Sequence, residues 1–128
     1  MKKPMVCLVE DYADNRVLVS ALLRPTGVEV VSVDSGPALT PLLVEGFNPV
    51  LFLIDLSLPG EDGTSIMRRL RSDPRWTECP IIAITAHAMA GDRERGLSTG
   101  FDDYITKPID VATFPMRLAK YLPRPSAS

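Results

Sequence analysis

The chain lacks several patterns that would place it in common classes of protein. Its longest apolar runs are far shorter than a helix that crosses a bilayer requires. Its net charge is only −2, so it has no basic excess of the kind that binds nucleic acid. The start, MKKPMVCLVED, has two lysines but only a short apolar run, which is unlike a secretory signal peptide. We therefore expect a cytoplasmic protein that binds neither DNA nor membranes directly.

Histidine and cysteine are also scarce. His87 is the only histidine, so no second histidine can share a metal with it. The two cysteines, Cys7 and Cys79, lie in or beside apolar runs, and in a cytoplasmic protein we expect them to be reduced thiols. No internal repeat is visible.

What the chain does contain is typical of one globular domain. It has 128 residues, of which 45% are hydrophobic and 23% charged, which is enough apolar material for a single core. We expect residues 1–122 to form this domain and the last six, PRPSAS (123–128), to be a frayed tail.

Short apolar runs alternate with helix-like segments along the chain. Four runs predict strands, at residues 5–9, 28–33, 50–54 and 80–85, and a weaker fifth covers DYIT at 103–106. Apart from the second, the four runs are essentially apolar throughout, as in strands covered on both faces. The segments between and after them predict helices at residues 13–24, 36–47, 64–73, 89–100 and 110–122. We expect Asp110 to cap the last helix and Pro115 to give it a kink or a late start. The alternation predicts an α/β fold with a parallel sheet and helices on both faces.

Polar residues stand where the predicted strands end. Glu10 and Asp11 follow the first strand, Asp55 the third, and Lys107 the fifth, while Thr85 ends the fourth. The carboxyl ends of parallel strands share one edge, so these side chains should meet there. Three close carboxylates repel one another unless a cation is present, and oxygen ligands suit Mg²⁺. A carboxylate, a hydroxyl and a lysine beside Mg²⁺ suit phosphoryl transfer, with aspartate as the nucleophile.

Four segments carry a resemblance to a known family: VEDYADN (9–15), LIDLSLPGEDG (53–63), ITAHAM (84–89) and DDYITKPID (102–110). They resemble the receiver domain of two-component response regulators, in particular free-standing single-domain regulators and the receivers of hybrid histidine kinases. The resemblance implies a doubly wound (βα)5 flavodoxin-like sandwich whose five-stranded parallel sheet has the order 2-1-3-4-5.

The resemblance also assigns a metal site. It implies that Asp55 is the phosphoryl acceptor. Asp11, Asp55 and the backbone carbonyl of Ser57 would bind Mg²⁺ directly, and Glu10 would act largely through water. Ser57 and His87 occupy positions that vary in the family and tune the lifetime of the phosphoryl group.

Further residues would respond to the phosphoryl group. The resemblance implies that Lys107 pairs with its oxygens, that Thr85 hydrogen-bonds one of them, and that Tyr104 is the switch aromatic. It also implies a cis peptide bond between Lys107 and Pro108.

The function implied is that of a signalling phosphoacceptor rather than an enzyme. A histidine kinase or histidine phosphotransfer protein would supply the phosphoryl group, and the surface formed by residues 89–122 would signal to a downstream protein target. We expect a monomer or a weak dimer. A receiver module of a hybrid histidine kinase, or a phosphorelay intermediate, is the alternative within the same family.

Three other functions remain open at this point. A phosphohydrolase of the haloacid dehalogenase type also uses a strand-end aspartate, but it needs a second acid where this chain has Ser57. A flavodoxin-like electron carrier needs phosphate-binding donors after the first strand, where this chain has acids. A receiver that binds partners without phosphorylation would not need the full set of site residues.

The implied strand order also bears on the cysteines. It places the first and fourth strands on either side of the third, about 9.5 Å apart. A disulfide allows a Cα separation of roughly 7 Å at most. We therefore predict no disulfide between Cys7 and Cys79.

Overall fold

The computed structural model describes residues 3–58, 60–86 and 100–122, and it contains one five-stranded sheet. The strands follow the order β2-β1-β3-β4-β5, and each neighbouring pair is parallel. Both the fold class and the strand order are as predicted. The strands are β1 (Met5–Val9), β2 (Glu29–Val33), β3 (Leu51–Asp55), β4 (Ile81–Thr85) and β5 (Asp103–Thr106).

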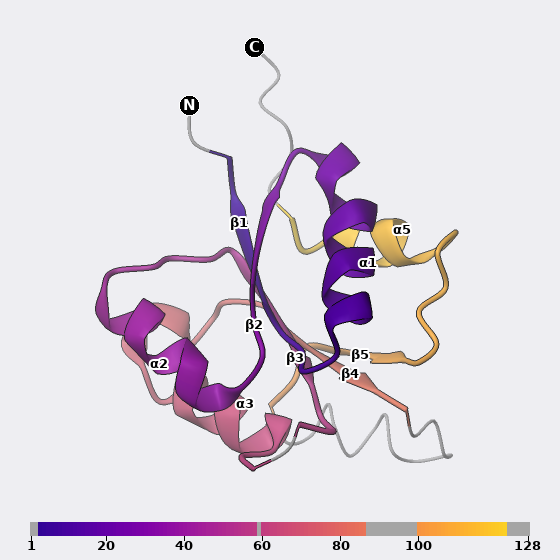
Figure 1. Ribbon diagram of the computed structural model, residues 1–128. Helices are drawn as coiled ribbons and strands as arrows, with labels where there is room; N and C mark the ends of the chain where they lie inside the picture. Colours follow the sequence, from indigo (N-terminus) through magenta and orange to yellow (C-terminus); the bar gives the residue numbers. More distant parts are fainter. Residues whose placement is uncertain (1–2, 59, 87–99, 123–128) are drawn as a thin grey trace.

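Helices cover both faces of the sheet (Figure 1). On one face lie α1 (Ala13–Leu23) and α5 (Phe114–Ala119), and on the other lie α2 (Gly36–Val44) and α3 (Gly63–Arg71). Two short 3-10 helices, η1 (Arg24–Thr26) and η2 (Pro74–Trp76), follow α1 and α3. The predicted helix 89–100, except for Gly100, and the predicted tail 123–128 lie outside the described residues.

Two hydrophobic cores, one on each face, hold these layers together. Successive strand residues point to opposite faces: Val6 and Leu8 of β1 pack toward α1 and α5, whereas Cys7 and Val9 pack toward α2 and α3. The same alternation runs through β3 and β4, whose residues are all buried. It explains why these runs are apolar throughout, while the edge strand β2 is more exposed.

Local hydrogen bonds decide where the helices begin. The Asp62 carboxylate accepts a hydrogen bond from the Ser65 backbone N–H at 2.9 Å, so α3 starts one residue earlier than predicted. Ser35 caps α2 in the same way, through the N–H of Ala38. The structure ends α2 at Val44, three residues before the predicted end, and the chain then turns with a positive φ of 86° at Gly46.

The start of the last helix differs from one prediction and agrees with another. Asp110 does not cap α5, because its carboxylate accepts a hydrogen bond from the Ala112 N–H in a turn that precedes the helix. The helix begins only at Phe114, with Thr113 at the N-cap. Proline is tolerated in the first turn of a helix, where its missing N–H has no partner to lose, so Pro115 forces the late start that we predicted.

Ion pairs tie the start of β5 to both layers of helices. Asp102 accepts a hydrogen bond from Arg71 at the end of α3. The next residue, Asp103, accepts from Arg117 of α5 and from the Tyr121 hydroxyl at 3.2 Å. Two adjacent acids therefore connect α3 on one face with α5 on the other.

Two further observations concern the cysteines and the lengths of the helices. Cys7 and Cys79 are both free, as predicted. Across the described residues, no helix is both long enough and apolar enough to cross a membrane.

Candidate functional site

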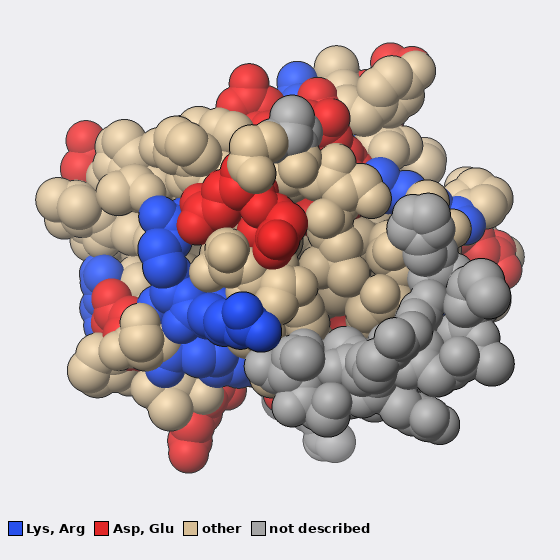
Figure 2. All heavy atoms as spheres, turned by 90° about the horizontal axis from the view of Figure 1, so that it is seen from below, with Lys and Arg blue, Asp and Glu red and all other residues tan. Residues whose placement is uncertain are grey.

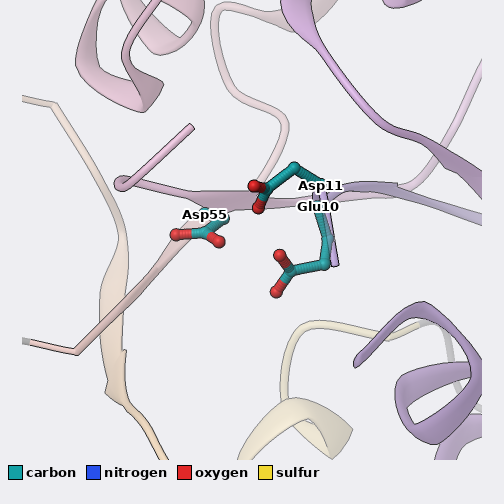
Figure 3. A group of neighbouring side chains, drawn as sticks. All are labelled: Glu10, Asp11 and Asp55. Carbon is teal, nitrogen blue, oxygen red and sulfur yellow. The ribbon is translucent and has the colours of Figure 1, made fainter. Parts of the chain in front are cut away.

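Three carboxylates from two neighbouring strands converge at the carboxyl edge of the sheet (Figure 3). Glu10 and Asp11 directly follow β1, and Asp55 is the last residue of β3, which pairs with β1. One carboxylate oxygen of each residue lies within 4.8 Å of the others. Glu10 and Asp55 are buried, at 1% exposure each, whereas Asp11 is exposed. Figure 2 views the molecule from below Figure 1 and shows acidic side chains gathered next to a group of basic side chains.

A lysine that follows the edge strand β5 reaches the buried acids. Lys107 directly follows β5, and its Nζ lies 2.8 Å from Asp55 Oδ2 and 3.3 Å from Glu10 Oε1. The Lys107 backbone N–H donates to the Thr85 carbonyl, which holds the end of β5 against the end of β4. The peptide bond between Lys107 and Pro108 is cis. If all three acids ionise, two negative charges remain uncompensated by this single ammonium.

Glu10 is held by donors that the sequence did not indicate. Its carboxylate accepts hydrogen bonds from Asn15 Nδ2 at 3.1 Å and from the Tyr12 backbone N–H at 3.2 Å. Arg16 Nη1 donates to its backbone carbonyl at 2.9 Å. Asn15 and Arg16 lie in the first turns of α1, and only the turn between β1 and α1 brings them back to Glu10. Asn15 is the last residue of the segment VEDYADN (9–15) and Arg16 directly follows it, but neither was assigned a role from the sequence.

The pKa values of Glu10 and Asp55 are shifted in opposite directions. Burial, together with a hydrogen bond to Asp55, raises the pKa of Glu10 to about 7, although the Tyr12 N–H and the charge of Lys107 oppose this shift. Burial also raises the pKa of Asp55, but hydrogen bonds from Glu10, Lys107 and Ser57 outweigh it and lower the pKa overall. Burial lowers the pKa of Lys107, and its ion pair with Asp55 reverses this, so the net shift is upward. Below pH 7 the proton of this pair therefore lies on Glu10, and Asp55 is the charged carboxylate.

The backbone packs closely around Asp55. Its Oδ1 accepts a hydrogen bond from the Ser57 N–H at 2.8 Å, which fixes the orientation of the carboxylate. Gly63, the first residue of α3, has no room for a side chain, since a Cβ there would lie 2.7 Å from the Asp55 carbonyl oxygen. The missing side chain lets α3 begin directly against the end of β3.

The remaining predicted site residues lie on β4 and β5. Thr85, at 2% exposure, is the last residue of β4 and pairs in register with Thr106. Tyr104 pairs with Ala83, so it lies on the same face of the sheet as Thr85, toward α2 and α3. Its side chain is buried, at 8% exposure. Arg117 of α5 donates to its backbone carbonyl at 3.0 Å. His87 lies outside the described residues.

The donor set fits a hard divalent cation. All side-chain ligands in the cluster are carboxylate oxygens, and Mg²⁺ prefers such ligands together with water. The exposed Asp11 leaves one side of the cluster open to solvent. A divalent ion would offset the negative charge that Lys107 leaves uncompensated, which is one unit when Glu10 is protonated and two when all three acids are ionised. The site can therefore hold Mg²⁺ next to a charged, oriented aspartate.

Comparison with known proteins gives a consistent result. The family model described as the response regulator receiver domain matches residues 6–119. The chain is 40% identical over 112 residues to the sensor histidine kinase GacS of Pseudomonas protegens, covering 84% of this chain. It is 37% identical over 117 residues to the polar-differentiation response regulator DivK of Brucella ovis, covering 91% of this chain.

These relatives differ greatly in length. The chain spans only 12% of the length of the GacS proteins and 53% of the phosphate regulon regulator PhoB of Rhizobium meliloti. It spans 94% of DivK.

Solved structures share the same fold. The chemotaxis response regulator CheY4 of Vibrio cholerae superposes with a TM-score of 0.84, covering 94% of this chain and all of that one, at 21% identity. The receiver domain of the sensor histidine kinase PA1611 of Pseudomonas aeruginosa has a TM-score of 0.79 at 34% identity, covering 94% of this chain and 98% of that one. That structure holds a magnesium ion in its active site cleft.

Proposed function

Because the chain belongs to the family of response regulator receiver domains, we propose that Asp55 accepts a phosphoryl group and that the domain acts as a signalling switch. Receiver domains interact with histidine kinases or phosphotransfer proteins, and a phosphohistidine of such a protein is the proposed donor. The observation that carries the proposal is the placement of one buried, charged aspartate between a lysine and two further acids.

The proposed transfer is a single displacement at phosphorus. An Asp55 carboxylate oxygen attacks the phosphorus atom, an O–P bond forms, and the P–N bond to the donor imidazole breaks. The electron pair of that bond returns to the imidazole nitrogen. Asp55 suits the role of nucleophile because its lowered pKa keeps it ionised, while the proton of the buried pair stays on Glu10. The Ser57 N–H orients the attacking carboxylate.

The new group changes the charge of the pocket. An acyl phosphate adds a charge of about −1.5 to −2 at neutral pH. Lys107 lies within reach of Asp55 and would transfer its contact to the phosphoryl oxygens, while the Thr85 hydroxyl would donate to one of them. When bound by Asp11, Asp55 and the Ser57 carbonyl, with Glu10 acting through water, Mg²⁺ supplies the remaining charge compensation.

The response would pass from Thr85 to the surface around β5 and α5. Thr85 and Tyr104 lie on the same face of adjacent strands, so a movement of Thr85 toward the phosphoryl group would alter the packing of Tyr104. Such a change biases an equilibrium between two arrangements of that surface. A downstream protein target would read the surface, without direct binding to DNA. The domain would assist its own phosphorylation and dephosphorylation, but it is not proposed to turn over a separate substrate.

Two settings for the domain are consistent with this role. The match to nearly the full length of DivK favours a free-standing regulator. The 40% identity to a segment of GacS favours the receiver module of a hybrid kinase, or an intermediate of a phosphorelay. Transfer of the phosphoryl group from Asp55 onward to a purified phosphotransfer protein would favour the second setting.

The proposal is tested with a small phosphodonor. Purified protein is incubated with phosphoramidate and Mg²⁺, and its intact mass is measured. We expect the wild type to gain one phosphoryl group and Asp55→Asn to gain none, because the amide is not a nucleophile. As a matched control, Asp34→Asn removes an exposed acid that follows β2 at the same edge of the sheet, and this variant should be labelled like the wild type.

Two outcomes would contradict the proposal. Labelling of Asp55→Asn at the wild-type level would place the acceptor elsewhere. Sustained release of phosphate from a generic phosphomonoester would instead indicate a phosphohydrolase.

A further inference from the structure

The two oxygens of the buried Glu10 carboxylate have different donors. Oε1 accepts a hydrogen bond from Asn15 Nδ2 at 3.1 Å and lies 3.3 Å from Lys107 Nζ. Oε2 accepts a hydrogen bond from the Tyr12 backbone N–H at 3.2 Å. Within the described part of the chain, an amide and an ammonium thus share one oxygen of Glu10, and a backbone N–H holds the other.

The first turn of α1 fixes the place of the Asn15 side chain. The backbone N–H groups of Asn15 and Arg16 each donate to the Tyr12 carbonyl at 3.1 Å, at the start of the helix. Arg16 Nη1 donates to the Glu10 carbonyl at 2.9 Å. Both the main chain and the carboxylate of Glu10 are therefore tied to this turn, and Asn15 is already in position to hold Oε1.

Lys107, in contrast, is shared between two acids. Its Nζ lies 2.8 Å from Asp55 Oδ2, closer than the 3.3 Å that separates it from Glu10 Oε1. In the proposed phosphorylated state the ammonium pairs with the phosphoryl oxygens on Asp55, and this new pairing draws it away from Glu10. The Asn15 amide then stays as the donor to Oε1, because it belongs to a helix that the transfer does not involve.

Loss of a donor matters at this position because Glu10 is only 1% exposed. A buried acceptor that loses its hydrogen bond keeps the cost of desolvation without the compensating contact. Water reaches the Glu10 carboxylate poorly, so it does not replace a missing amide. The carboxylate would instead leave the orientation that directs it toward the cluster.

We infer that Asn15 is a positioning residue that keeps the Glu10 carboxylate in the cluster after Lys107 turns to the phosphoryl group. The inference rests on the proposed function. Before transfer, Asn15 and Lys107 hold Oε1 together, so removal of the amide has a small effect. After transfer, the amide acts without the ammonium and its removal has a large effect. Groups that orient the carboxylates of a metal site typically change metal affinity by about 10–100-fold when they are removed.

Asn15→Leu tests this difference, because it removes the donor and keeps a side chain of similar size. Calorimetry on the full chain gives the affinity for Mg²⁺ at about pH 8, above the pKa of Glu10. Fluorine NMR in saturating Mg²⁺ gives the affinity for beryllofluoride, which mimics the phosphoryl group. We expect Asn15→Leu to weaken the binding of Mg²⁺ alone about twofold and that of beryllofluoride about tenfold.

Two further variants complete the test. Asn48→Leu removes the other asparagine of the chain, at an exposed position before β3 begins, and should leave both affinities unchanged. Asn15→Ala removes the same donor with a smaller side chain and should weaken the two ligands by the same factors as Asn15→Leu. A loss that only Asn15→Leu shows would come from the shape of leucine and would overturn the inference.

The remaining outcomes separate this inference from the proposed function. Equal weakening of both ligands would mean that Asn15 only supports the fold, and an unchanged affinity for beryllofluoride would mean that Glu10 does not depend on it. Either result overturns the inference and leaves Asp55 as the acceptor. A wild type that binds Mg²⁺ but no beryllofluoride would overturn the inference and the proposed function together.

Discussion

Replacing Lys107 by methionine would test how the buried acids are compensated. Methionine has a similar length but no charge, so Glu10 and Asp55 would lose the ammonium that lies 3.3 Å and 2.8 Å from them. A hydrogen bond to a charged group contributes about 1.5–3 kcal/mol. The Lys107 side chain is 22% exposed, so solvent reduces this contribution, and we expect a loss of about 2 kcal/mol in the free energy of unfolding.

Thermal unfolding without divalent ions measures this loss. With an unfolding entropy of about 2.1 cal/mol/K per residue over 128 residues, the midpoint should fall by about 7 °C. Mg²⁺ should then stabilise the variant more than the wild type, because no ammonium opposes the ion in the cluster. At a concentration of about 100 times its dissociation constant, the ion adds about 2.7 kcal/mol to the free energy of unfolding.

Lys120→Met is the matched control, since it removes an exposed lysine just beyond α5. Its midpoint should stay close to that of the wild type. An unchanged midpoint in Lys107→Met, together with an unchanged response to Mg²⁺, would refute the view that Lys107 offsets the charge of the buried acids.

Two further predictions concern the pH dependence of stability and the contribution of Arg71. The raised pKa of Glu10, about 7, means that the folded state binds an extra proton, so its contribution to stability without metal is complete below pH 4.5 and disappears as the pH rises to about 7. Urea unfolding across this range should show the decline in the wild type and a smaller one in Glu10→Gln, and an equal slope in both would assign the proton to another group. Arg71→Met should lower the free energy of unfolding by about 3 kcal/mol, because Arg71 donates to the carbonyls of Gly100, Trp76, Thr77 and Cys79 as well as to Asp102. Arg68→Met, on the exposed side of the same helix, should change it by less than about 0.5 kcal/mol, and comparable losses in the two variants would contradict the role given to Arg71.

The parts of the fold that depend on periodicity could be predicted from the sequence. Strands buried on both faces require uninterrupted apolar runs, so β3 and β4 were located to within a residue. The convergence of Glu10, Asp55 and Lys107 follows from parallel strands that end at one edge, whatever the spacing between them in the sequence. The first result depends on the pattern of apolar residues along a strand, and the second on the common carboxyl edge of parallel strands.

Other features depend on contacts that no local pattern specifies. Asn15 and Arg16 reach Glu10 only because of the angle between β1 and α1. Arg75 of η2 donates to the Leu43 carbonyl of α2 across the fold, and η2 itself is a three-residue element too short to leave a periodic signal. The misplaced cap at Asp110 has a similar origin, because an aspartate before a helix also forms a turn of its own.

The adjacent acids at the start of β5 have a mechanical consequence. Asp102 is anchored to α3 and Asp103 to α5, so the peptide unit between them couples helices that lie on opposite faces of the sheet. If β5 slides along its own axis, it must either drag both helices with it or break an ion pair on one side. The strand β5, which Lys107 directly follows, therefore links the two layers of helices, and the strength of each ion pair sets how a displacement of the strand is shared between them.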